Sequence, residues 1–134
     1  MRLSQKNRQA LILAARTAAK TAYCPYSQFR VGAAVLAGGS IYAGSNIENS
    51  SFGLTICAER VAIFKAVSDG AVSISAIAIA CIDAKSRSSD QDRMPCGACR
   101  QVMSEFATRS FVAIVDEVGS FNMHQLLPKA FRLR

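Results

Sequence analysis

The chain of 134 residues is long enough for one domain with its own buried core, and we expect residues 1–134 to form that domain. Its 51% hydrophobic and 19% charged residues indicate a globular protein, and no stretch approaches the roughly 20 apolar residues that a membrane span requires. The net charge of +7 comes from scattered basic residues, which favours a solvated surface over a nucleic-acid interface and leaves attraction of an anionic partner as the alternative.

The first predicted element is an amphipathic helix over residues 3–22. Apolar side chains recur there at helical spacing, and Pro25 follows, which cannot continue a helix. The same segment mixes charges into its apolar run, so it lacks the uninterrupted core of a signal peptide. We therefore expect a cytoplasmic protein.

A β-hairpin and a second helix follow. The predicted strands are residues 31–36 and 40–47, and the pair Gly38-Gly39 provides the turn between them. After the polar loop NSSFGLT, residues 57–70 are predicted to form a helix that ends near the glycine at its last position.

The second half of the chain alternates between strand and helix. The predicted elements are a buried strand at 73–82, an exposed loop at 83–93, a helix at 96–108 started by Pro95, a strand at 110–116 and a short helix at 123–128. This alternation indicates parallel strand pairs covered by helices, so we expect a three-layer α/β domain.

Cysteines at two predicted helix starts suggest a metal or thiol site. In a reducing cytosol, five cysteines without a dense framework indicate metal ligands or catalytic groups. The segments are TICAER and PCGACR, and helix N-termini favour the thiolate form of a cysteine. If the two starts face each other, they form a three-sulfur pocket of Cys57, Cys96 and Cys99. Taken alone, PCGACR is also compatible with half of a structural zinc site, with a redox-active cysteine pair, or with two small residues that have no chemical role.

Three protein ligands would leave one position of a tetrahedral zinc ion open, as in catalytic sites. Glu59 stands two residues after Cys57, and it is a candidate to move a proton from an activated water to a substrate nitrogen. Zinc with three thiolates carries a net charge of −1, so some group must withdraw charge from the sulfurs. The candidates are Arg60, Arg100 and the two helix ends. This chemistry suits hydrolysis of a carbon–nitrogen bond.

The spacing C-x-E followed by P-C-x-x-C is the signature of zinc-dependent nucleoside and nucleobase deaminases. Five segments in order resemble the small, homotetrameric class of cytidine deaminases: YCPYSQFRVGAAVL, GSNIEN, ICAERVAIFKAVSDG, PCGACRQVMSEF and QLLPKAF. The resemblance covers nearly the whole chain. It implies a three-layer α/β/α cytidine-deaminase-like fold with a mixed, mostly five-stranded sheet.

The implied reaction is hydrolytic deamination of cytidine and 2′-deoxycytidine to uridine and 2′-deoxyuridine with release of ammonia, a step of pyrimidine salvage. The resemblance identifies Cys57, Cys96 and Cys99 as ligands of one zinc ion per subunit. By the same resemblance, Glu59 is the proton shuttle that also holds the ring nitrogen, and Arg60 donates hydrogen bonds to the thiolates.

The resemblance also implies how the substrate is held. The implied contacts are Phe29 with the pyrimidine, Asn46 and Glu48 with the ribose hydroxyls, Ala58 through its backbone N–H with the base carbonyl, and Phe52 and Phe131 with the site of a neighbouring subunit. A homotetramer with active sites at its subunit interfaces follows from the same likeness. Two departures stand out: members often have tyrosine at the position of Phe52, and the loop Asp83 to Met94 is longer and more polar than usual.

Other functions remain as alternatives. One alternative implied by the resemblance is a deaminase that acts on a cytosine-nucleoside antibiotic such as blasticidin S. A non-catalytic module would instead hold four-coordinate zinc or a reversible Cys96–Cys99 disulfide. A polynucleotide editor ranks last, because the chain lacks an obvious strand-binding extension. We expect neither nucleic acid nor membrane as a partner.

Overall fold

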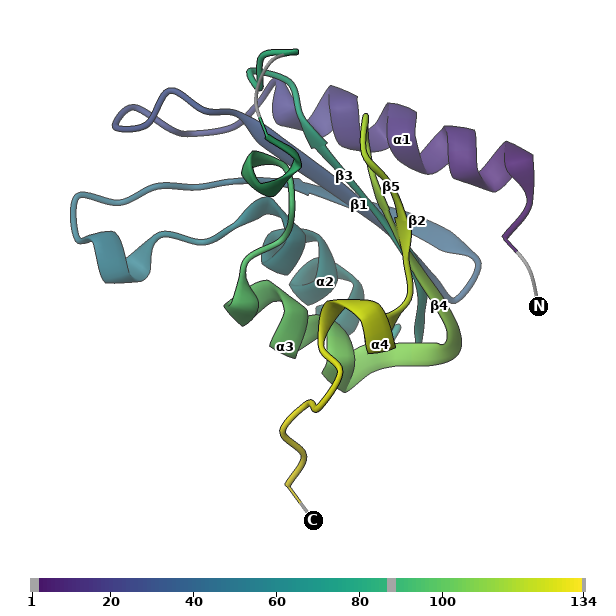
Figure 1. Cartoon of the computed structure of the whole chain (residues 1–134). Helices are drawn as coiled ribbons and strands as arrows, with labels where there is room; N and C mark the ends of the chain where they lie inside the picture. Colours follow the sequence, from purple (N-terminus) through teal and green to yellow (C-terminus); the bar gives the residue numbers. More distant parts are fainter. Residues whose placement is uncertain (1–2, 87–88, 134) are drawn as a thin grey trace.

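The computed structural model describes residues 3–86 and 89–133, and its centre is a mixed five-stranded sheet (Figure 1). The strand order is β2-β1-β3-β4-β5. The strands are β1 (Val31–Ala37), β2 (Ser40–Ser45), β3 (Ile74–Cys81), β4 (Ala107–Val115) and β5 (Gly119–Phe121). The helices are α1 (Gln5–Ala19), α2 (Ala58–Ser68), α3 (Gly97–Phe106) and α4 (Met123–Leu126), with 3₁₀ turns η1 (Phe52–Leu54) and η2 (Asp90–Asp92).

Helices cover both faces of the sheet, so the expected three-layer α/β/α fold is confirmed. Helix α1 lies on one face, and α2, α3 and α4 lie on the other (Figure 1). The β3–β4 pair is parallel and is connected through α3, whereas the other three strand pairs are antiparallel. The β1–β2 hairpin turns at Gly38 and Gly39, both with positive φ, as a two-residue hairpin loop requires.

The two faces of the sheet carry side chains of different size. On β3, the larger side chains Ile77 and Ile79 point toward α2 and α3, while Ala76, Ala78 and Ala80 point toward α1. Because successive strand residues face opposite sides, this alternation gives α1 a nearly flat alanine surface. Helix α1 can therefore lie close to the sheet backbone.

Several predicted boundaries differ from the structure. Strand β2 ends at Ser45, and Ile47 forms only isolated bridges, with Tyr23 and Ile56. Residues 107–108 begin β4 instead of ending α3, because Ala107 pairs with β3. Strand β5 was not predicted.

The polar loop predicted at residues 83–93 contains the turn η2. Residues 87–88 of that loop lie outside the described residues. Within the part of the chain that the structure describes, no helix has both the length and the apolar character to cross a bilayer.

Close packing of α1 makes Gly32 a sensitive position. A Cβ atom there would overlap the carbonyl oxygen of Ala15 and would lie 2.5 Å from the backbone nitrogen of Ala19. We expect Gly32→Ala to lower the free energy of unfolding by about 3 kcal/mol or more, because helix backbone cannot move aside as a side chain can. Urea unfolding measures this change.

The matched control is Gly53→Ala, since an added Cβ at Gly53 meets nothing within 4 Å. It should change stability by less than about 1 kcal/mol. Equal urea midpoints for the two variants would contradict the close approach of α1.

Candidate active site

Cysteines cap the first turns of two neighbouring helices. Cys57 is the N-cap of α2 and Cys96 is the N-cap of α3, and neither side chain makes a capping hydrogen bond. Cys99 lies in the first turn of α3 and is buried. The positive ends of both helix dipoles therefore lie beside the thiols, where they stabilise negative charge on sulfur.

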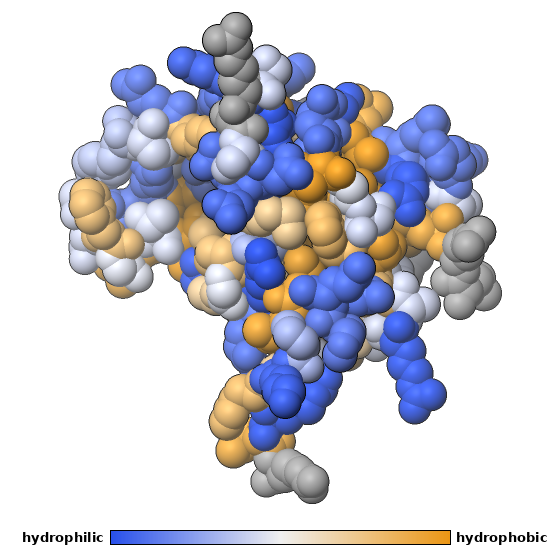
Figure 2. All heavy atoms as spheres, in the orientation of Figure 1, coloured by the Kyte–Doolittle hydropathy of each residue, from blue (hydrophilic) through white to orange (hydrophobic). Residues whose placement is uncertain are grey.

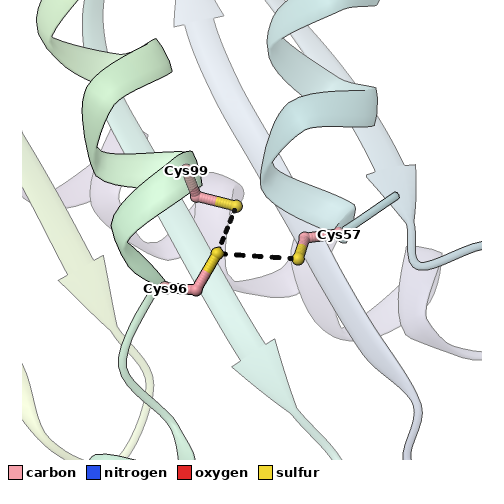
Figure 3. Close-up of side chains that lie close together, drawn as sticks. All are labelled: Cys57, Cys96 and Cys99. Carbon is pink, nitrogen blue, oxygen red and sulfur yellow. Dashed lines mark hydrogen bonds between the residues drawn. The ribbon is translucent and has the colours of Figure 1, made fainter. Parts of the chain in front are cut away.

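The three sulfur atoms form one compact group (Figure 3). The Sγ atoms of Cys57 and Cys96 are 3.9 Å apart, those of Cys96 and Cys99 are 3.5 Å apart, and all three lie within 4.8 Å of one another. Tetrahedral zinc with Zn–S bonds of about 2.3 Å separates its sulfurs by about 3.8 Å. The spacing thus fits a zinc ion with three cysteine ligands.

Arg60 supplies positive charge to this group. Its Nη2 donates to Cys57 Sγ at 3.5 Å, and hydrogen bonding to Cys57 raises the pKa of the guanidinium above its ordinary value. Its Nε is buried and has no acceptor among the described residues. A buried donor without a partner is uncommon, and a negatively charged sulfur would provide the missing acceptor. Arg60 therefore fits thiolates held by a metal.

The thiols of Cys57 and Cys99 have pKa values shifted in opposite directions. The neighbouring Cys99 thiol, and after it Arg60, lower the pKa of Cys57 to about 5, although burial opposes this shift. The same interaction with Cys57, together with burial, raises the pKa of Cys99 above its ordinary value. One thiolate therefore forms readily, and a cation is needed to hold three negative sulfurs together.

The Arg100 guanidinium donates its hydrogen bonds to backbone carbonyls. Its Nε donates to the carbonyl of Pro95 at 2.8 Å, and its Nη1 donates to the carbonyl of Leu126 at 2.9 Å. Among the described residues, Arg60 rather than Arg100 is therefore the arginine that donates a hydrogen bond to a sulfur of the group. The Arg100 side chain instead ties the start of α3 to the end of α4.

Glu59 is a buried carboxyl group next to the sulfurs. Only 4% of its surface is exposed, and burial raises its pKa to about 7. Charge on Cys57 adds to the shift, and a backbone hydrogen bond opposes it. A carboxyl with a pKa near 7 can both accept and release a proton at neutral pH, which suits a general acid–base group.

A cavity of about 520 Å³ opens beside Glu59 and two of the sulfurs. Residues from the sequence prediction that line it are Phe29, Asn46, Glu48, Cys57, Ala58, Glu59 and Cys96. They come from the segment before β1, the segment after β2, and the starts of α2 and α3. This volume is in the range of pockets that bind a small organic ligand.

Two polar residues of the cavity are fixed by backbone contacts. Asn46 accepts from the Val31 N–H with Oδ1 and donates with Nδ2 to the Phe29 carbonyl, both at 2.9 Å. Glu48 Oε1 accepts from the N–H groups of Tyr26 and Ser27. Hydrogen bonds from Ser27 keep the pKa of Glu48 below its ordinary value. These contacts hold an amide and a carboxylate in fixed orientations at one side of the cavity.

Phe52 and Phe131 do not enter the cavity. Phe52 lies in η1 with 76% of its surface exposed and meets Tyr26 edge to face, with ring centroids 6.0 Å apart. Phe131 lies in the C-terminal tail with 70% exposed, and its carbonyl accepts from Gln101. Within one chain, neither residue lines the cavity that Cys57 and Cys96 line.

One wall of the cavity was not predicted from the sequence. Asp92, Arg93 and Met94, at the end of the polar loop, line the cavity together with Cys81 from the end of β3. Nothing in the sequence of the polar loop indicated that its end lines the cavity. The only available signal was that the loop directly precedes Pro95, and hence the cysteines of α3.

Comparison with known proteins identifies a zinc-binding domain. Residues 5–115 match the family described as "Cytidine and deoxycytidylate deaminase zinc-binding region". A probable cytidine deaminase of Dictyostelium discoideum is 44% identical over 132 residues, which cover 96% of this chain and 86% of the relative. A cytidine deaminase of Sporosarcina psychrophila is 45% identical over 128 residues, which cover 92% of this chain and 90% of the relative.

Solved structures share the fold. The cytidine deaminase of Mycobacterium tuberculosis is similar with a TM-score of 0.79 at 35% identity, covering 95% of this chain and 98% of that chain. The cytidine deaminase of Burkholderia pseudomallei gives a TM-score of 0.77 at 38% identity, covering 96% and 100%. Together with the match over residues 5–115, these similarities establish that the chain belongs to the cytidine and deoxycytidylate deaminase family.

Proposed function

We propose that the protein hydrolytically deaminates cytidine and 2′-deoxycytidine to uridine and 2′-deoxyuridine, releasing ammonia. The observation that carries this proposal is a buried carboxyl, Glu59, beside three clustered thiols in one cavity. The names of the relatives, cytidine deaminases that match most of this chain, support the choice of substrate.

Cys57, Cys96 and Cys99 are proposed to hold one zinc ion per subunit. Their sulfur spacing supports this assignment, as does the zinc-binding description of the family. When bound, zinc supplies the Lewis acidity that activates a water molecule for attack. Arg60 and the two helix N-termini stabilise the thiolates that this role requires.

Glu59 is assigned the proton transfers. The reaction adds the oxygen of water to C4 of the cytosine ring and breaks the bond from C4 to the amino nitrogen. One proton of the water ends on N3 and the other on the leaving nitrogen, so cytidine and water give uridine and ammonia. The pKa of about 7 allows the Glu59 carboxyl to take up and pass on each proton.

The substrate contacts are proposed for residues of the same cavity. Phe29 would pack on the base, and Asn46 and Glu48 would bind the ribose hydroxyls. Ala58 would donate its N–H to the base carbonyl, since first-turn N–H groups have no acceptor within the helix. The fixed amide of Asn46 supports its assignment, because a preorganised group loses little freedom on binding.

We infer a homotetramer in which exposed aromatic residues complete neighbouring sites. Figure 2 shows hydrophobic residues on the projecting η1 segment and on the C-terminal tail, where Phe52 and Phe131 are exposed. A further groove, lined partly by Ile47, Ile56 and Phe64, lies along α2. Exposed apolar surface of this kind is typical of contacts between subunits.

Two further assignments belong to this proposal. Residues 1–134 are taken as one domain, supported by core clusters on both faces of a single sheet. A cytoplasmic location is supported by five free cysteines, which a reducing compartment preserves.

Glu59→Gln tests the proton shuttle. The amide is similar in size but cannot take up the proton, so we expect uridine formation to fall by about 10²–10⁴-fold. The absorbance change from cytidine to uridine measures the rate, and metal analysis of the same sample should still find one zinc per chain. Turnover near the wild-type rate would rule out this role of Glu59.

Arg60→Gln tests the charge that supports the thiolates. We expect zinc affinity to fall by about 10–100-fold, as for other residues that hydrogen-bond metal ligands. Competition with a chromogenic chelator measures the affinity. Arg109→Gln, at an exposed position of β4, is the control and should retain zinc as the wild type does. Equal zinc affinity in the two variants would show that Arg60 does not stabilise the site.

Co-expression of two inactive variants tests whether subunits share residues. Phe52→Ala should be inactive because no subunit provides the aromatic ring to a neighbouring site. Glu59→Gln should be inactive because each site lacks the carboxyl that transfers protons. In mixed oligomers, the Glu59→Gln subunit supplies the ring that the other subunit's site needs, so activity should reappear. The shared site would be contradicted if the co-expressed variants were no more active than each variant alone. It would also be contradicted if light scattering showed the protein to be monomeric.

A further inference from the structure

Three consecutive backbone N–H groups just before and at the start of β1 donate to side chains instead of to a neighbouring strand. The pairs are Phe29 with Ser27 Oγ at 3.1 Å, Arg30 with Asp83 Oδ2 at 2.8 Å, and Val31 with Asn46 Oδ1 at 2.9 Å. Ser27 is local, and Asn46 already belongs to the cavity. Asp83 is different, because it reaches this segment from the loop that follows β3.

Asp83 holds Arg30 by three hydrogen bonds. Besides the backbone N–H, the Arg30 guanidinium donates with Nε to Oδ2 at 2.9 Å and with Nη2 to Oδ1 at 2.8 Å. Both carboxylate oxygens are thus engaged by a single residue. Charge-assisted, two-point contacts of this kind are among the stronger and more directional hydrogen bonds in proteins.

The residue held in this way follows directly after Phe29, which lines the cavity. Gln28, on the other side of Phe29, adopts a φ of +57°, an unusual value for a residue with a side chain. Such a conformation persists only where surrounding contacts impose it. The Gln28 N–H donates to the Cys24 carbonyl at 2.9 Å, so the backbone is held on both sides of Phe29.

Asp83 also begins the loop whose far end lines the same cavity. Arg93, one of the lining residues, donates with Nη2 to the carbonyls of Ala84 and Lys85, at 3.4 and 3.1 Å. The beginning and the end of this loop are thus tied together. Asp83 lies where this loop meets the Phe29 segment, so it connects two walls of the cavity.

We propose that Asp83 is a positioning residue of the site, which fixes the backbone at Arg30 and thereby aims the Phe29 ring at the substrate base. This inference rests on the proposed function. Asp83 does not line the cavity, so its effect on catalysis passes through Phe29. Binding of the base should depend on Asp83 more than the chemical step does.

Asp83→Ala is the principal test, with Asp116→Ala as the matched control. Asp116 forms a similar two-point pair with Arg16 of α1, at 2.6 and 2.8 Å, on the other face of the sheet. We expect Asp83→Ala to raise KM for cytidine about tenfold and to change kcat less than about twofold, since loss of alignment weakens binding. The control should leave KM unchanged.

Two conservative variants separate the backbone contact from the ion pair. Asp83→Asn keeps an oxygen that can accept from the Arg30 N–H, and Arg30→Met keeps that N–H while removing the guanidinium. Both should have KM within about threefold of the wild type, because the backbone contact is retained. If Asp83→Ala does not fold, Asp83→Glu replaces it. That side chain is one methylene too long for the three contacts, so KM should still rise.

Hydrogen exchange provides a readout that needs no substrate. The N–H groups of residues 29–31 should exchange faster in Asp83→Ala than in Asp83→Asn or the wild type, with zinc content equal in all. The inference would be overturned if Asp83→Ala had the exchange rates and the KM of the wild type. It would also be overturned if Asp116→Ala raised KM as much as Asp83→Ala does. If the wild-type protein does not deaminate cytidine, the proposed function is overturned, and this role of Asp83 with it. If the wild type is active and Asp83→Ala has unchanged KM and exchange rates, only the role of Asp83 is overturned.

Discussion

The close approach of two helix N-termini is the constraint on which the site depends. It brings Cys57 from α2 within 3.9 Å of Cys96 from α3, although 39 residues separate them in the chain. Both helices direct the positive end of their dipole at the sulfurs, and Arg60 adds a full charge. Thiolates that would repel one another in isolation can therefore gather around a cation. Glu59, carried by the same first turn of α2, lies beside them without a separate element to position it.

The rest of the fold keeps these helix starts in place. The alternation of large and small residues on β3 separates the two faces of the sheet, so that α2 and α3 pack on isoleucines while α1 packs on alanines. Burial in the layer of α2 and α3 also raises the pKa of Glu59 to about 7. Stability and reactivity thus share a cause. The packing that excludes water from the core also prepares the carboxyl to exchange protons.

Features with a local sequence signal could be predicted, and the structure brings the residues concerned together. The cysteines, Glu59 and Arg60 could be expected near one another because they lie at two predicted helix starts with short spacings, and the resemblance joined the two segments into one site. Strand β5 was not predicted, because a strand of three residues is too short for any periodicity. Neither was the contact of Asp83 with Arg30, which joins residues 53 positions apart and has no motif. The contacts of Arg100 with two backbone carbonyls were not predicted either, because adjacency to Cys99 in sequence does not tell which way a long side chain turns.

The most direct test of the account is X-ray absorption at the zinc edge of the purified protein. The central claim is a zinc ion held by three sulfurs with a fourth position left for a light atom. The account predicts three sulfur neighbours at about 2.3 Å and one oxygen or nitrogen neighbour at about 2.0 Å. Four sulfur neighbours would make the site structural instead of catalytic. Two sulfurs, or no stoichiometric zinc, would show that Cys57, Cys96 and Cys99 do not act together as ligands.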